Sequence, residues 1–369
     1  APPANQLKRA KKAQQRRNRL AKDKLPAASP AKLLDDAEAA AASGDPSTAL
    51  ALTEAAVRSL KPSNLAATDV SLLERAGVRL LELGQPDGAL DCLLRCAAAA
   101  PDTGHAKFFY LAQLSSGEAA LVYLDRGIEL LTAASNSSAT STAASASASS
   151  SVSQELASAW CARCELFMTD LCDRPDAEAQ CEAALAEALA RRPDSAEALQ
   201  QRAGLRLVQQ RPEEALADLR LSLNLWLPLR RQAAEAAEVH DDENGAAAAD
   251  PDECGLTAEQ RLRCAEMLLE LGELETCVDV LDLLMEEDDE VAQVWLLFGL
   301  AYSRQGNASA ARYHLQKARA LVEPGDPVAG EIDQLLSELP PEGEDDASGA
   351  KDAGANDDEE LDEEFEEGE

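Results

Sequence analysis

Residues 291–322 read VAQVWLLFGLAYSRQGNASAARYHLQKARALV. Apolar residues recur every three or four positions on both sides of Gly306, which predicts two amphipathic helices that meet at that glycine. Large side chains fill the seam between the helices, while Gly299 and Ala311 let the two backbones approach closely. Pro324 blocks continuation of the second helix. The stretch therefore predicts an antiparallel pair of packed helices.

The same frame recurs along the chain. Gly272 lies 34 residues before Gly306, and the frame appears again around Gly77, Gly84 and Ala89. A period of about 34 residues with these small residues is typical of the tetratricopeptide (TPR) repeat. We predict an all-α fold, a right-handed superhelical TPR solenoid of about seven helix pairs plus a capping helix. The cap is expected to bury one apolar face, formed by Ile332, Leu335, Leu336 and Leu339.

Composition excludes several classes of function. The chain carries 34 Lys and Arg against 68 Asp and Glu, a net charge of −34, which disfavours direct binding to nucleic acid or to an anionic membrane. No run of apolar residues is long enough for a membrane span, and the N-terminus lacks the apolar segment of a secretory signal. We therefore expect a cytoplasmic and nuclear protein whose nine cysteines are mostly free thiols packed as small apolar residues.

Charge and low-complexity segments divide the chain. We predict a basic disordered segment at 1–29, a TPR solenoid at 30–339 with inserted loops at 133–153 and 231–255, and an acidic disordered tail at 340–369. The basic run within residues 8–19 is interpreted as a nuclear import signal that binds an import receptor, as an RNA-contacting arm, or as a solvated helix. The tail is either a solubilising segment or a shield for a basic partner.

Four segments carry a resemblance to one family. FYLAQLSSGEAAL at 109–121, ELFMTDLC at 165–172, PDSAEALQ at 193–200 and LMEEDDE at 284–290 resemble the TPR chaperones dedicated to large-subunit ribosomal protein four, here called L-four. The resemblance covers roughly residues 30–340, and the sequence departs from the family pattern at the two loops and in the Ala-rich first repeat. It implies a non-enzymatic protein that binds the long basic internal loop of newly made L-four, keeps it soluble and escorts it to the nucleus.

Groove-lining positions of the first helix in several repeats hold acidic side chains. Counting along the repeats places the following residues in a client-binding groove: Glu74, Glu82, Glu165, Met168, Glu259, Leu262, Glu266, Leu269 and Glu270. The leucines and the methionine are expected to form an apolar floor, and the glutamates to attract a basic client. The alternative is that glutamate is simply a good former of exposed helix.

No catalytic, cofactor-binding or metal-binding motif is predicted. Cys161-x-x-Cys164 lies within a predicted helix and has no second pair at ligand spacing, so we interpret both cysteines as packing residues. The dedicated chaperone competes with a TPR co-chaperone or adaptor and with a passive scaffold. A co-chaperone that holds the acidic tails of heat-shock proteins needs Lys, Arg and Asn in its groove, whereas the positions counted here carry Glu.

Overall fold

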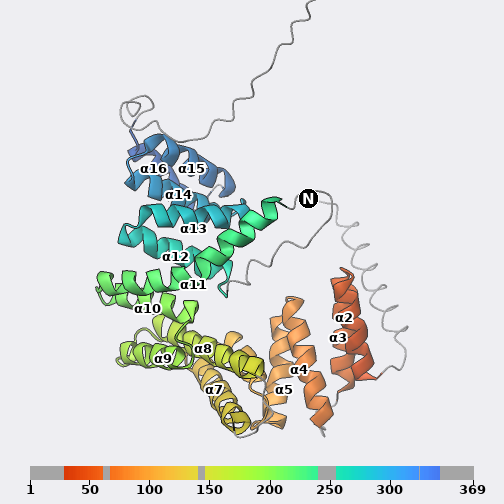
Figure 1. The fold of residues 1–369 in the computed structure, drawn as a ribbon. Helices are drawn as coiled ribbons and strands as arrows, with labels where there is room; N and C mark the ends of the chain where they lie inside the picture. The colour runs from red at the N-terminus through yellow and green to blue at the C-terminus, as the bar shows by residue number, and fades with distance from the viewer. Residues whose placement is uncertain (1–28, 61–66, 140–145, 240–254, 324, 341–369) are drawn as a thin grey trace, which may run out of the picture. The chain divides into compact units, whose positions relative to one another are not determined.

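The computed structural model describes residues 29–60, 67–139, 146–239, 255–323 and 325–340. Those residues form fifteen α-helices and contain no strand (Figure 1). In chain order the helices are α2 (Pro30–Ala42), α3 (Pro46–Ser59), α4 (Ala67–Glu82), α5 (Pro86–Ala99), α6 (Ala106–Gln113), α7 (Gly117–Ala139), α8 (Ala146–Met168), α9 (Ala177–Arg191), α10 (Ala196–Val208), α11 (Pro212–Val239), α12 (Ala258–Leu271), α13 (Leu274–Glu287), α14 (Ala292–Arg304), α15 (Ala308–Leu321) and α16 (Pro327–Glu338).

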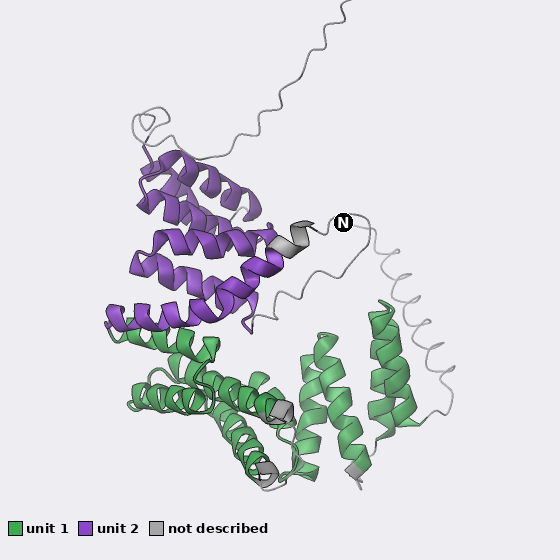
Figure 2. Cartoon of the chain, in the orientation of Figure 1, with its two compact units in different colours: residues 1–209 green, residues 210–369 purple. Residues whose placement is uncertain are grey.

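The chain divides into two compact units, residues 1–209 and 210–369 (Figure 2). In the first unit, α2 packs on α3, α4 on α5, α6 on α7, and α8 on α9. In the second unit, α12 packs on α13 and α14 on α15, and α16 covers α15. These six pairs pack as predicted, whereas α10 and α11, which follow the fourth pair in the chain, belong to different units. The all-α fold with a final capping helix is confirmed.

Glycines occupy two kinds of position that the repeat pattern requires, the turn after the first helix of a pair and the contact between the two helices. Gly306 and Gly272 both follow a first helix of a pair with φ near +79° and +78°, a left-handed conformation that glycine adopts without the penalty of a Cβ. Gly299 on α14 lies against α15, where an added Cβ would come within 2.5 Å of Leu315 Cγ. Ala311 beside it is fully buried. The close approach of the two backbones is thus as predicted.

The last helix closes the second unit. Ile332 of α16 is fully buried against Leu315 and Ala318 of α15, and partly buried leucines of α16 pack on the same cluster. Pro327 stands in the first turn of α16, where its missing N–H costs no hydrogen bond, and Asp326 caps the helix by accepting from Val328 N. This confirms the predicted capping helix.

The two segments predicted as loops are partly helical. Helix α7 continues through Ala139 and α8 begins at Ala146, and α11 continues to Val239. Alanine has the highest helix propensity, so an Ala-rich sequence can extend a helix that packing already holds at its other end. In α8, Val152 provides such packing, because it contacts a buried cluster. The loop prediction is wrong for these residues. Residues 140–145 and 240–254 of the predicted loops, the basic segment 1–28 and the acidic tail 341–369 lie outside the described residues.

None of the helices in the described ranges is both long enough and apolar enough to cross a membrane.

Candidate functional site

A pocket of about 390 Å³ lies in the first unit between α6, α7 and α8. Helix α8 supplies one wall, because residues spaced three and four apart along it share a single face. The residues of that wall are Glu155, Ser158, Ala159, Ala162, Glu165 and Leu166. Helix α6 contributes Phe109, Ala112 and Gln113, helix α7 contributes Ala120 and Leu124, and Thr169 and Asp170 follow the end of α8.

Small residues create the space in this pocket. Ala112, Ala159 and Ala162 line it with methyl groups only. The Phe109 ring lies so close to Gly127 of α7 that a Cβ at Gly127 would overlap it. Together with Leu124 and Leu166, this ring gives the pocket an apolar floor.

Carboxylates stand around that floor. Glu155 accepts a hydrogen bond of 2.8 Å from His105 Nε2, a contact that ties α8 to the start of α6. Asp170 accepts a hydrogen bond of 2.7 Å from the backbone N–H of Gly117. Glu165 is half-buried in the α8 wall. Three carboxylates over an apolar floor favour a cationic ligand with an apolar stem, such as a Lys or Arg side chain.

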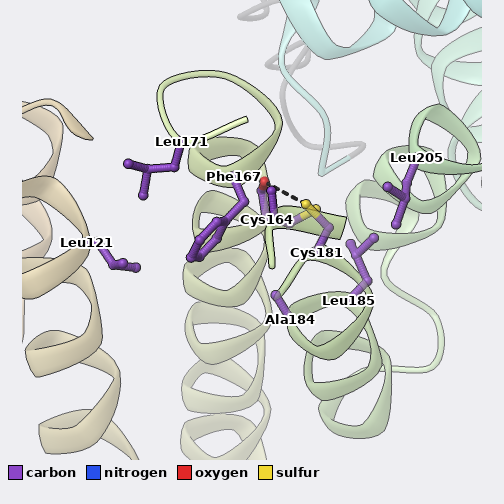
Figure 3. Packing of buried hydrophobic residues seen from close by; sticks show 9 residues of the cluster. Leu121, Cys164, Phe167, Leu171, Cys181, Ala184, Leu185 and Leu205 are labelled. Carbon is purple, nitrogen blue, oxygen red and sulfur yellow. Dashed lines mark hydrogen bonds between the residues drawn. The ribbon is translucent and has the colours of Figure 1, made fainter. Parts of the chain in front are cut away.

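The other side of α8 is held by a tightly packed cluster (Figure 3). In this cluster Phe167 of α8 lies on the side of Leu121 of α7, and the Cys181 thiol of α9 donates to the Cys164 carbonyl of α8 at 3.6 Å. Because this cluster fixes the rotation of α8, the opposite face of the helix, with Glu155 and Glu165, must line the pocket.

The predicted groove residues of the first unit occupy different environments. Glu165 lines the pocket. Met168, on the same helix, packs instead against the cluster behind α8. Glu82 on α4 is exposed and pairs with Arg79 at 2.5 Å. Glu74 on the same helix is half-buried, and its charge acts on the buried ammonium group of Lys107.

Lys107 is a buried charge that the sequence did not predict. It is only 1% exposed, and it donates to the backbone carbonyls of Thr103 and Gly104, which end the loop before α6. Burial lowers the pKa of this lysine, and the negative charge of Glu74 acts in the opposite direction. Glu74 therefore acts on the charge of a buried lysine of the same chain, a role that counting repeat positions does not show.

The predicted residues of the second unit lie along α12. Glu270 is exposed, Glu259 is exposed and pairs with Arg263 at 3.5 Å, and Glu266 accepts a hydrogen bond of 2.5 Å from Gln293 of α14. Leu262 is half-buried. The structure brings these residues onto one helix.

Leu269 is only 5% exposed and belongs to the buried face of α12. Its place in the client-binding groove stays a prediction.

Two pocket carboxylates were missed by the sequence analysis. Glu155 and Asp170 both line the pocket with Glu165. Glu155 lies ten residues before Glu165, close to three helical turns, so its place on the same face was visible in the sequence. Asp170 follows the last turn of α8, and no periodic signal marks it.

The cysteines behave as packing residues, as predicted. Seven of the eight described cysteines are buried, and Cys172 is exposed. Cys161 and Cys164 are both fully buried within α8. Burial raises the pKa of the Cys161 thiol above its usual range, which keeps it protonated and unreactive. Within the described ranges, no group of three or more His, Cys, Asp or Glu is arranged to hold a metal ion.

Two relatives are similar to this chain in sequence. The probable assembly chaperone of rpl4 from Schizosaccharomyces pombe is 30% identical over 199 residues, which cover 54% of this chain and 52% of that protein. The probable assembly chaperone of rpl4 from Emericella nidulans is 28% identical over 280 residues, which cover 73% of this chain and 63% of that protein. The chain thus spans between half and two-thirds of the length of these curated relatives. No protein-family model matches it.

The fold is similar to that of a solved structure, an assembly chaperone of RpL4 (Acl4). The two share 29% sequence identity with a TM-score of 0.61, and the match covers 76% of this chain and 98% of the solved one. In sequence and in fold, this chain is therefore similar to the assembly chaperones of rpl4.

Proposed function

We propose that this chain is a non-enzymatic chaperone that binds newly made ribosomal protein L-four and keeps it soluble before assembly of the large subunit. The observation that carries the proposal is the similarity in sequence and fold to proteins named as assembly chaperones of rpl4. The carboxylate-lined pocket between α6, α7 and α8 supports it independently, since its charge suits a basic client.

The proposed client segment is the basic internal loop of L-four. Its Lys and Arg side chains would place their stems on Phe109 and Leu124 and their charges beside Glu155, Glu165 and Asp170. Each partly exposed ion pair of this kind contributes only about 0.2–1 kcal/mol, so binding is distributed over many contacts and is sensitive to salt.

The sign of the charge in the pocket distinguishes this function from that of an adaptor that binds the acidic tails of heat-shock chaperones. Such an adaptor needs cations and amides in its groove to hold carboxylates. The described pocket presents three carboxylates, which would repel an acidic tail.

Replacing Glu165 with Lys tests the pocket. Glu165→Lys adds repulsion to lost attraction, so it should weaken binding of the L-four basic segment about tenfold, or about 1.4 kcal/mol, in a calorimetric titration. The matched control is Glu187→Lys on α9, an exposed glutamate outside the pocket that pairs only within its own helix. Equal loss in both variants, or no loss in either, would place the client elsewhere.

Escort to the nucleus is part of the same proposal. The basic run within residues 8–19 is proposed to bind an import receptor, which gives the protein both a cytoplasmic and a nuclear location. A fluorescent fusion that lacks residues 8–19 should stay in the cytoplasm. Unchanged nuclear entry of that fusion would contradict this part of the proposal without touching client binding.

A further inference from the structure

Two cysteines meet in the seam between α8 and α9 (Figure 3). Cys164 of α8 is 0% exposed and Cys181 of α9 is 2% exposed, and both belong to the buried cluster behind the pocket. The Cys181 thiol donates to the Cys164 carbonyl at 3.6 Å, and the Cys164 thiol donates to the sulfur of Cys181. The two sulfur atoms are therefore within hydrogen-bonding reach of each other, although the cysteines stand 17 residues apart in the chain.

The place of this pair in the repeat explains the contact. In the second unit, the thiol of Cys277 on α13 donates to the carbonyl of Ala265 on α12 at 3.3 Å, which is the same contact that Cys181 makes with Cys164. These are the facing positions of a helix pair, 34 residues before the glycine and the alanine that let α14 and α15 approach closely. A disulfide needs Cα atoms about 4.4–6.8 Å apart, and two helices provide so short a separation only where they approach most closely.

The other described cysteines are placed differently. Of the packed helix pairs in the described ranges, only α8–α9 and α12–α13 carry a cysteine on both helices. In the second of these, Cys264 stands one position before the facing residue Ala265, so its side chain points about 100° away around α12. Cys161, one turn before Cys164, belongs to a different buried cluster. Among the described cysteines, Cys164 and Cys181 are therefore the two whose thiols are placed to bond.

The two thiols differ in acidity, which distinguishes their chemical roles. The pKa of the Cys181 thiol lies below its ordinary value, because the Cys164 thiol donates to its sulfur and because the positive charge of Arg163 acts on it. The pKa of the Cys164 thiol is raised by the same hydrogen bond and by burial. Cys181 is therefore the thiol that ionises first and attacks an oxidant. Hydrogen peroxide is scarcely larger than water, so a local opening of the seam admits it.

We propose that Cys164 and Cys181 form a redox-sensitive site at which hydrogen peroxide closes a disulfide between α8 and α9. The Cys181 thiolate attacks one peroxide oxygen, the O–O bond breaks, and the departing hydroxide takes up the proton that Cys181 released. The sulfur of Cys164 then attacks the sulfenic acid at the Cys181 sulfur, the S–O bond breaks, and the oxygen leaves as water with the proton of the Cys164 thiol. Two thiols and one peroxide thus give one disulfide and two water molecules, and a dithiol reductant reverses the change.

The disulfide clamps the helix that forms one wall of the pocket. Glu155 and Glu165 line the pocket from the opposite face of α8, so a covalent bond from α8 to α9 fixes the rotation of that wall, whatever the pocket binds. The bond also closes a loop across a separation of 17 residues, which restricts the unfolded chain. Oxidation should therefore raise the midpoint of thermal unfolding by about 5 °C.

Peptide mapping of the full chain tests the site. The chain is treated with hydrogen peroxide, its remaining thiols are alkylated in denaturant, and it is digested with a protease that cleaves at acidic residues, several of which lie between the two cysteines. Mass spectrometry should detect peptides linked through Cys164 and Cys181, which separate on reduction. Cys264 and Cys277 are the internal control and should be recovered alkylated. Overturning results are a link from Cys172 in place of the expected one, an equal yield of a link in the control pair, or no link when the exposed Cys172 is already oxidised.

Thermal unfolding of matched variants tests the clamp. Cys164→Ala and Cys181→Ala should fold, because buried alanines such as Ala265 and Ala311 stand at the facing positions of other pairs. Peroxide should raise the unfolding midpoint of the parent by about 5 °C and leave both variants unchanged. Cys277→Ala removes a thiol of the control pair and should gain as much from peroxide as the parent does. A parent that gains nothing, or a gain that survives either of the first two variants, would contradict the proposal.

Discussion

Gly299 is the residue on which the packing of α14 against α15 depends most. A Cβ added there would meet Leu315 Cγ at 2.5 Å and lie 3.4 Å from the Ala311 carbonyl oxygen, and Leu315 is only 1% exposed. This close contact was predictable from the repeat pattern, because a glycine and an alanine stand at the two facing positions.

Replacing this glycine should therefore destabilise the protein. Gly299→Ala should lower the free energy of unfolding by about 1–3 kcal/mol through overpacking, seen as a lower midpoint in thermal unfolding followed by circular dichroism. The matched control is Gly330→Ala in α16, where nothing lies within 4 Å of the added Cβ. That change should raise stability by about 0.5–1 kcal/mol, because alanine favours helix. A stabilising Gly299→Ala would contradict the packing described here.

At the scale of helices, one buried carboxylate joins three elements of the second unit. Glu287 at the end of α13 pairs with Arg261 of α12 and Arg230 of α11, and the two arginine side chains are 1% and 8% exposed. Arg261 Nη2 donates to Glu287 Oε2 at 2.9 Å. No local sequence signal shows this network, because its members lie far apart in the chain and each looks like an ordinary exposed helix residue.

Loss of the shared carboxylate should be costly. Glu287→Gln removes the carboxylate charge that both buried guanidinium groups contact, and loss of one member of a buried ion pair costs about 3–5 kcal/mol in comparable cases. The neighbouring Glu286→Gln, at an exposed position, should change stability by less than about 0.5 kcal/mol. Urea unfolding of both variants measures the difference. Similar midpoints for the two would show that the network does not hold α11, α12 and α13 together.

Helix boundaries were also less predictable than helix existence. The repeat period predicted the six packed pairs and the cap, since apolar spacing and small residues report directly on packing. The same reasoning took 133–153 and 231–255 as loops, because it weighed apolar burial and not the helix propensity of alanine.

At the scale of the whole molecule, charge is the property that links sequence to the proposed function. The net charge of −34 and the glutamates of the first helices were visible in the sequence, and Glu165, predicted for the client-binding groove, lines the pocket. The pocket itself was not predictable, because it depends on the packing of Phe109 over Gly127 and on the rotation of α8 set by the cluster behind it.

The most direct measurement is a calorimetric titration of the purified basic internal loop of L-four into the full chain at low and at high salt. We predict saturable binding with one loop per chain, and an affinity that falls as salt rises because exposed ion pairs carry much of the interaction. An acidic control peptide of equal length should not bind. Absence of binding by the basic loop, or an affinity that salt does not change, would contradict the account.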